Sequence, residues 1–170
     1  VIEVAESCFS KCPSLRSVAI PSTVTTVADY AFWGCSSLVS AKLPPGLVHV
    51  GDYAFRDCTS LLSVAIPDGV VSLGISAFDG CHSLASAVVP SSVVSLANRT
   101  FADCTHLVVA MVLAPNATVI AELGAGIPEC EAFPGCSRLQ YIVAPTQFVR
   151  DPGQHFRGTP VLSAGGLVED

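Results

Sequence analysis

The sequence predicts a right-handed solenoid of stacked coils, built mostly from short parallel strands and loops. Three residue types recur at every twenty-third position: phenylalanine from Phe9 to Phe101, cysteine from Cys12 to Cys104, and leucine from Leu15 to Leu107. Proline keeps the same step for four copies, beginning at Pro21. Self-similarity at a fixed period of this length is the signature of a repeat architecture, so each repeat unit is expected to form one coil.

A sixth copy departs from the period. Phe133 follows Phe101 at a longer interval than the regular step, and Cys136, Leu139 and Pro145 complete the pattern. The extra residues lie around 115–117 and in 125–131. We therefore predict two regions: a solenoid over residues 1–145, with five regular repeats and one irregular repeat, and a C-terminal flank or linker over residues 146–170. Because the pattern is already under way at Val1, we expect the chain to be a piece of a longer protein.

The strand of each repeat is the first element to place, and residues 47–69 serve as the example. Val64 and Ile66 alternate, so both side chains point to one face of a short strand, with Leu61 preceding them. Pro67 ends the strand because its nitrogen has no hydrogen to donate to a strand ladder. The pair Asp68-Gly69 is typical of a turn.

The rest of the repeat brings the chain back to the next strand. Leu47 and Val50 are expected in the core, and Gly51 marks a tight bend. Phe55 and Cys58 are three positions apart, as on one face of a helix, so the segment around them is expected to form a single helical or 3-10 turn.

A single coil of this kind cannot bury its own apolar face, but stacked coils can. Neighbouring strands would lie ~4.7–4.9 Å apart, and each phenylalanine would lie on the next. Parallel crossover connections favour the right-handed form. The predicted core is therefore a narrow column of stacked, identical residues.

The repeat resembles the BspA-like leucine-rich repeats. The residues that carry the resemblance are Ala54-Phe55, Cys58, Ser60-Leu61, Ser63-Val64 and Ile66-Pro67, which follow the L-x-x-L-x-L spacing at a 23-residue period. The resemblance covers roughly residues 1–145 and implies surface or secreted proteins that adhere to or bind other proteins, with no enzyme chemistry. Repeat five departs from the pattern, with Thr100 before its phenylalanine and Leu113 in place of the proline, which suggests a degenerate end of the array.

Composition argues against several classes of partner. The net charge is −6, and the eight Lys and Arg residues are scattered, so nucleic acid and anionic membranes are not expected partners. The longest apolar run, residues 107–114, is far shorter than the ~18–20 residues of a spanning helix, so no membrane insertion is expected in this segment. No cofactor is implied, and a small-molecule ligand is not favoured.

The cysteines predict buried thiols and no disulfide framework. Six of the eight share one repeat position, where stacking makes their Cβ vectors parallel instead of convergent. Cys8 lies at the position of Ala31 in the next repeat and is expected to be a small core residue. Cys130 lies in the irregular insert and is the candidate for an exposed thiol or for a bridge to Cys136. Cys8 and Cys12 come near the spacing of a zinc-binding pair, but the repeat positions explain them better, and no metal site is predicted.

Other polar candidates have structural alternatives. His82 and His106 lie in adjacent coils, but two imidazoles without a carboxylate make a weak metal site. Glu6, Asp29 and Asp52 share one repeat position, which indicates either a divalent-cation edge or, as we favour, a solvated acidic rim. Asn98 and Asn116 begin glycosylation sequons, and use of the first is doubtful because Thr100 is expected to point inward.

The candidate binding residues lie on the outward face of the strands. One row is Ser17, Ser40, Ser63, Ser86 and Val109, and the next includes Lys42, Val88 and Met111. A continuous solenoid face of this kind can bind a partner, but small residues also stack without clash, and both interpretations are open. Trp33, the sole tryptophan, is a candidate exposed anchor on the same surface, or it packs on a neighbouring coil.

These patterns predict a non-enzymatic protein-binding scaffold with a protein ligand, at the cell surface or secreted. No catalytic residue is assigned. An intracellular protein-interaction module and a structural spacer repeat are the alternatives, and a cytoplasmic location would suit the first because unpaired thiols persist in a reducing compartment.

Overall fold

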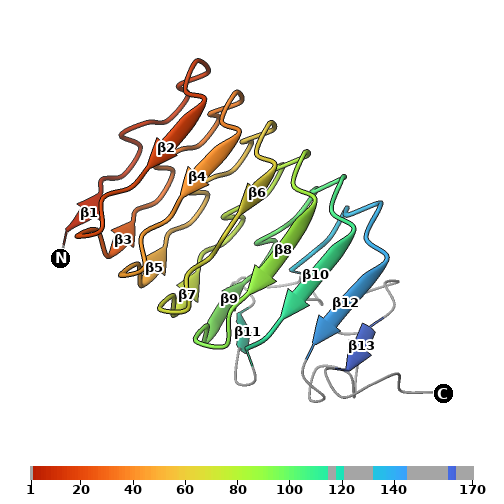
Figure 1. Cartoon of the computed structure of the whole chain (residues 1–170). Coiled ribbons are helices and arrows are strands. Elements are labelled where there is room, and N and C mark those ends of the chain that lie inside the picture. The colour runs from red at the N-terminus through yellow and green to blue at the C-terminus, as the bar shows by residue number, and fades with distance from the viewer. Residues whose placement is uncertain (1, 115–117, 121–131, 145–160, 164–170) are drawn as a thin grey trace, which may run out of the picture.

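The computed structural model describes residues 2–114, 118–120, 132–144 and 161–163 of the chain. Its coils are stacked side by side, and each coil contributes two short strands, so the molecule has two rows of parallel strands (Figure 1). This architecture confirms the predicted leucine-rich-repeat type of solenoid.

The first row is a six-stranded sheet in the order β1-β3-β5-β7-β9-β11. Its parallel pairing joins equivalent positions of successive repeats, as in Thr26 opposite His49 and His49 opposite Ser72. The strands are very short: β1 Glu3–Val4, β3 Thr26–Val27, β5 His49–Val50, β7 Ser72–Leu73, β9 Ser95–Ala97 and β11 Thr118–Ile120.

The second row comes from the SLxSVxIP part of the repeat, and its strands form a three-stranded sheet, β2-β4-β6, and a four-stranded sheet, β8-β10-β12-β13. The pairing keeps the repeat positions opposite one another, as in Ser17 opposite Ser40. The strands are β2 Ser17–Ala19, β4 Ser40–Lys42, β6 Ser63–Val64, β8 Ser86–Val89, β10 Val109–Val112, β12 Tyr141–Ala144 and β13 Val161–Ser163.

The last strand, β13, lies within residues 146–170, which the sequence indicates as a flank. It pairs in parallel with β12, with Ile142 opposite Val161. This short segment therefore extends the second row of strands, while the other residues of the predicted flank lie outside the described part of the chain.

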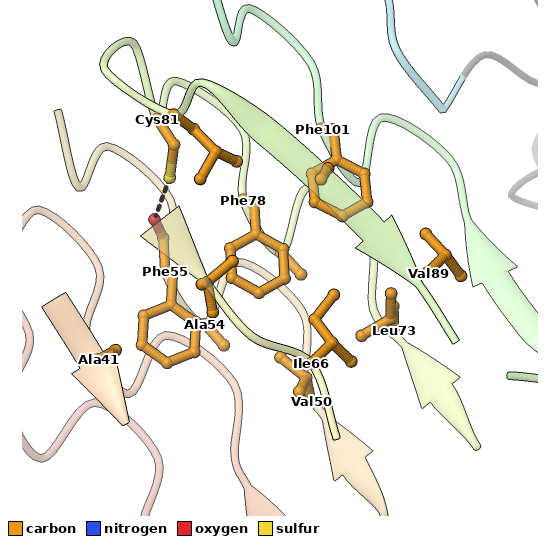
Figure 2. Packing of buried hydrophobic residues seen from close by; sticks show 14 of the residues in the cluster. Ala41, Val50, Ala54, Phe55, Ile66, Leu73, Phe78, Cys81, Val89 and Phe101 are labelled. Carbon is orange, nitrogen blue, oxygen red and sulfur yellow. Dashed lines mark hydrogen bonds between the residues drawn. The ribbon is translucent and has the colours of Figure 1, made fainter. Parts of the chain in front are cut away.

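The core between the two rows is a column of stacked phenylalanine rings, as predicted. Successive rings from Phe9 to Phe133 have centroids 5.0–5.3 Å apart and are within 10° of parallel. Figure 2 shows Phe55, Phe78 and Phe101 in this column, with Val50, Leu73 and Val89 contributed by strands around them and Ile66 by the segment after β6. Phe133 continues the column from the irregular sixth repeat, despite the longer connection before it.

The segment around each phenylalanine is a series of hydrogen-bonded turns, and no helix occurs among the described residues, so the predicted helical turn is wrong. Tyr30 and Gly34 have φ values of +56° and +71°, which lie in the left-handed region. Between them, alternate amides donate to the next coil, as Phe32 does to the Ala54 carbonyl at 2.8 Å. A helix would direct every amide along its own axis and would lose these bonds between coils.

Candidate functional site

The outward side chains of the second row of strands form a continuous surface, which we call the strand face. It consists of the rows predicted from the sequence: Ser17, Ser40, Ser63, Ser86 and Val109, and Ala19, Lys42, Ala65, Val88 and Met111. All are exposed except Val109, which is half-buried. The residues between them, such as Ala41 and Ala87, are buried, so strand alternation fixes which side chains face outward.

The strand face changes character along the solenoid. Its first three strands carry serine, alanine and Lys42, whereas β8 and β10 carry the exposed apolar side chains of Val88 and Met111. Tyr141 extends the apolar part, because it pairs with Val109 and its side chain is 47% exposed. Tyr141 is not among the residues predicted from the sequence. The interval from Val109 to Tyr141 equals the lengthened interval from Phe101 to Phe133, so the repeat pattern contains the signal for it.

Trp33 does not belong to the strand face. It lies in the turn between β3 and β4 and is half-buried. Its indole N–H donates to Asp57 Oδ2 at 3.1 Å, and Lys11 Nζ lies 4.6 Å from the ring centroid. The residue therefore packs between neighbouring coils, which agrees with the alternative interpretation, and its role in binding stays a prediction.

The imidazole rings of the three described histidines bond to backbone or hydroxyl groups of neighbouring coils. His82 Nδ1 lies 2.9 Å from the Asp103 carbonyl, and His106 Nδ1 lies 2.7 Å from the His82 carbonyl. His49 Nδ1 is 2.8 Å from Ser72 Oγ. Among the described residues, no group of three or more histidine, cysteine, aspartate or glutamate side chains could hold a metal ion. The fourth histidine, His155, lies outside these residues.

The acidic positions at the predicted rim bind the backbone of the next coil. Asp29 Oδ1 accepts a hydrogen bond from the Asp52 amide at 2.8 Å, and Asp52 Oδ1 accepts one from the Ile75 amide at 2.7 Å. The sequence prediction of a solvated rim missed this role. The recurrence of aspartate at one position of successive repeats is the signal that could have indicated it.

The thiols of the repeat are buried in the middle coils, as predicted. Cys35, Cys58, Cys81 and Cys104 are fully buried, and each thiol donates to the phenylalanine carbonyl of the preceding coil, as in the bond drawn between Cys81 and Phe55 in Figure 2. Burial raises the pKa of the Cys58 and Cys81 thiols well above the ordinary value. This ladder of four buried thiols is therefore protonated and unreactive at neutral pH.

Cys8 is a correction, because the structure exposes it where a buried residue was predicted. The alanines at the same position in later repeats are buried between coils, whereas no described coil covers the outer side of the first one. Thr100 does point inward, as predicted, and its hydroxyl donates to the Ala97 carbonyl at 2.6 Å. Asn116 and Cys130 lie outside the described residues.

Where the structure describes the chain, it contains no helix with the length and apolar character needed to cross a membrane.

A comparison of the sequence with known protein families identifies the same repeat that the structure shows. The family of the BspA type leucine rich repeat region matches residues 1–121 in six copies. No curated protein sequence matches the chain.

Solved structures agree with that match. A leucine-rich repeat protein from Bacteroides ovatus superposes with a TM-score of 0.71 at 26% sequence identity, over 85% of this chain and 35% of that protein. The T. pallidum leucine-rich repeat protein has a TM-score of 0.69 at 27% identity, over 94% of this chain and 80% of that protein. The pneumococcal vaccine antigen PcpA, at 17% identity and a TM-score of 0.53 over 87% of this chain and 41% of that protein, shares the fold.

Proposed function

Because the chain belongs to the BspA-type leucine-rich repeat family, we propose that it is a non-enzymatic scaffold whose strand face binds a partner protein, at the cell surface or in a secreted form. Resemblance to this family implies a role in adhesion and protein binding. The chain corresponds to about a third of the length of the Bacteroides ovatus protein that it matches, at 35%, so the proposal concerns the part of a protein that these residues form.

One observation carries the proposal: the strand face presents outward side chains in fixed rows. Ser40 pairs with Ser63, and Ala41 and Val64 beside them point into the core. The outward rows are thereby held at the strand spacing of ~4.8 Å before any partner arrives. A partner that matches these rows binds without the cost of ordering a flexible surface.

The apolar part of the strand face supplies the anchor. The side chains of Val88, Met111 and Tyr141 are 40%, 36% and 47% exposed on the neighbouring strands β8, β10 and β12. Contiguous apolar surface with an aromatic residue is typical of the energetic centre of a protein interface. The serine row beside it adds no charge that a partner would have to desolvate.

The experiment compares two variants that carry the same chemical change on different surfaces. The test variant is Val88→Glu with Met111→Glu, on the strand face. The control is Val71→Glu with Val94→Glu, two exposed valines just before β7 and β9. The wild-type chain and both variants are immobilised and exposed to one defined panel of purified extracellular proteins, and bound proteins are quantified by mass spectrometry and confirmed by surface plasmon resonance.

We expect a protein that binds the wild-type chain and the control but binds the strand-face variant at least about tenfold more weakly. A partner that is equally lost in both variants would contradict the assignment of the strand face. A structural spacer would retain no partner at all. Antibody labelling of intact source cells tests the location, and labelling that appears only after permeabilisation would favour the intracellular alternative.

A further inference from the structure

A second hollow surface lies on the other row of strands. A groove of about 600 Å³ follows the six-stranded sheet from β1 to β9, across five successive coils. One side is lined by the outward residues of the strands, such as Thr26, His49 and Ser72. A volume of this size is in the range of ligand-binding clefts, and its extent over several coils makes it elongated.

The groove has backbone along its floor. Ala28, Gly51 and Gly74 occupy one repeat position there. A Cβ atom added at Gly51 would lie 2.7 Å from the Asp29 nitrogen, and one added at Gly74 would lie 2.6 Å from the Asp52 nitrogen. Glycine is thus required at Gly51 and Gly74 for the coils to approach, so the floor of the groove carries no side chain at these two positions.

The charge of the groove has one sign. Glu3, Glu6, Asp29 and Asp52 line it, and none of the described lysines and arginines does. The Asp29 and Asp52 carboxylates do not need to be ordered by a ligand, because each already accepts a backbone amide of the next coil. Parallel stacking repeats the carboxylates of Glu6, Asp29 and Asp52 from coil to coil at ~4.8 Å. The groove is therefore a preorganised line of negative charge over a narrow floor.

We propose that this groove is a second interaction surface, and that it binds an extended, lysine- or arginine-bearing segment of a partner protein. The negative charge of the groove favours a cationic ligand, and its elongated shape favours an extended chain over a single ion. An extended peptide places alternate side chains ~6.6–6.8 Å apart, and the long stems of lysine and arginine reach carboxylates at the coil spacing. The surface is separate from the strand face, so it does not depend on the function proposed above.

The test uses a fluorescein-labelled octapeptide of alternating lysine and serine and measures fluorescence anisotropy with the full chain at low ionic strength. The test variant is Asp29→Asn with Asp52→Asn, because asparagine keeps the oxygen that accepts the backbone amide. The control is Asp68→Asn with Asp103→Asn, which changes the net charge equally at positions that do not line the groove. Thermal unfolding confirms that all variants are folded.

A second pair of variants tests the shape at constant charge. Thr26→Trp fills the groove, and Ser63→Trp places the same bulk on the strand face. We expect Asp29→Asn with Asp52→Asn to weaken peptide binding about tenfold, Thr26→Trp to weaken it by a similar factor, and both controls to change it less than twofold.

Equal weakening by the two asparagine pairs would show a response to net charge alone and would overturn the proposal. Unchanged binding by Thr26→Trp would place the peptide elsewhere and would also overturn it. Calorimetry with Ca²⁺ and with spermine tests for a small-cation site. If either cation binds and loses binding in Asp29→Asn with Asp52→Asn, while the peptide does not bind, the groove is a small-cation site and the proposal is overturned. The strand-face variant Val88→Glu with Met111→Glu should bind the peptide like the wild-type chain, so failure of one proposal leaves the other testable.

Discussion

At the scale of single residues, the position occupied by Lys11, Gly34, Asp57, Gly80, Asp103 and Gly135 has positive φ in every described coil. Glycine adopts this conformation without steric cost, whereas other residues are strained there. Asp57 Oδ1 also occupies the space beside Gly80, at 2.6 Å from where a Cβ atom would be. Aspartate and glycine therefore alternate from Asp57 onward because each aspartate side chain lies over the glycine of the next coil.

This alternation predicts that Gly80→Ala is more harmful than Gly34→Ala. Both lie at nearly the same φ, +72° and +71°, but at Gly34 the nearest atom is Lys11 Cγ at 3.5 Å, an ordinary contact. We expect Gly34→Ala to lower the free energy of unfolding by about 1 kcal/mol and Gly80→Ala by about 2 kcal/mol, because the Asp57 carboxylate has to move away from the added Cβ atom. Urea unfolding measures both, and equal losses would contradict the steric contribution of Asp57.

The buried thiols predict a loss of stability at alkaline pH. Burial raises the pKa of Cys58 and Cys81, so these thiols stay protonated in the folded state when unfolded thiols ionise above about pH 9. The unfolded state then binds fewer protons, and the free energy of unfolding falls as the pH rises, by about 1.4 kcal/mol per thiol between pH 8 and pH 10.

Urea unfolding at these two pH values checks this dependence in the wild-type chain and in Cys58→Ala with Cys81→Ala. The double variant should lose less stability over the interval than the wild-type chain does. Cys8→Ala is the matched control, because Cys8 is exposed, and its stability should follow the wild-type pH dependence closely. An unchanged dependence in the double variant would show that the ladder thiols are not the groups that titrate.

At the scale of the repeat element, each coil contributes one phenylalanine to the stacked column of the core. Phe55 is fully buried and stacks on Phe32 at 5.0 Å and on Phe78 at 5.3 Å. Phe9 stacks on a single ring among the described residues, that of Phe32, and is 41% exposed. We expect Phe55→Ala to cost about 3–5 kcal/mol and Phe9→Ala about 1 kcal/mol, measured by urea unfolding. Similar costs for both would mean that ring stacking contributes little to the stability of the column.

A second interaction that joins the coils is the hydrogen bond that an aspartate carboxylate accepts from a backbone amide of the next coil. Asp29→Ala removes the acceptor of the Asp52 amide, and we expect it to lower the free energy of unfolding by about 1 kcal/mol. Asp29→Asn keeps an acceptor oxygen and should lie within a few tenths of the wild-type value. A loss as large for asparagine as for alanine would assign the effect to the charge of Asp29 and not to its hydrogen bond.

The elements also show how far the sequence determined the fold. The phenylalanine column, the buried cysteines and the strand face follow directly from the period, because identical residues stack only in one phase. The six-stranded sheet was not predicted as a sheet. Most of its strands are as short as β5 His49–Val50, and a pair of residues is too few for alternation to be recognised.

The turns were predicted wrongly for a related reason. The spacing of Phe55 and Cys58 fits a helix, but it also fits a turn in which the Cys58 amide donates to the Phe55 carbonyl, at 3.3 Å. The left-handed Tyr53 and Asp57 distinguish the two, and neither residue type indicates positive φ as strongly as glycine does. Likewise, the groove and its backbone-bonded aspartates depend on contacts between coils, which the pattern within one repeat does not contain.

At the scale of the whole molecule, the strands of each described coil pair with those of adjacent coils in the stack, so stability is expected to depend on position. In such an array the free energy of unfolding is a sum of terms for the coils and for the interfaces between adjacent coils. The middle coils have two interfaces, and their phenylalanines and cysteines are fully buried. In the first coil Cys8 is exposed, and Leu15 and Val18 are only partly buried, although its backbone bonds resemble the others.

Amide hydrogen exchange distinguishes these contributions, because equivalent amides make equivalent bonds in different coils. The Phe9 amide donates to the Ala31 carbonyl at 2.9 Å, and the Phe55 amide donates to the Ala77 carbonyl at 2.8 Å. If the hydrogen bond of each amide alone determined its protection against exchange, the Phe9 and Phe55 amides would exchange at similar rates. Because opening of the first coil breaks one interface and opening of a middle coil breaks two, we expect the Phe9 amide to exchange roughly 100-fold faster or more. Phe55→Ala should then accelerate exchange in its own coil and in the coils on both sides, and uniform acceleration along the whole chain would instead identify a single cooperative unit.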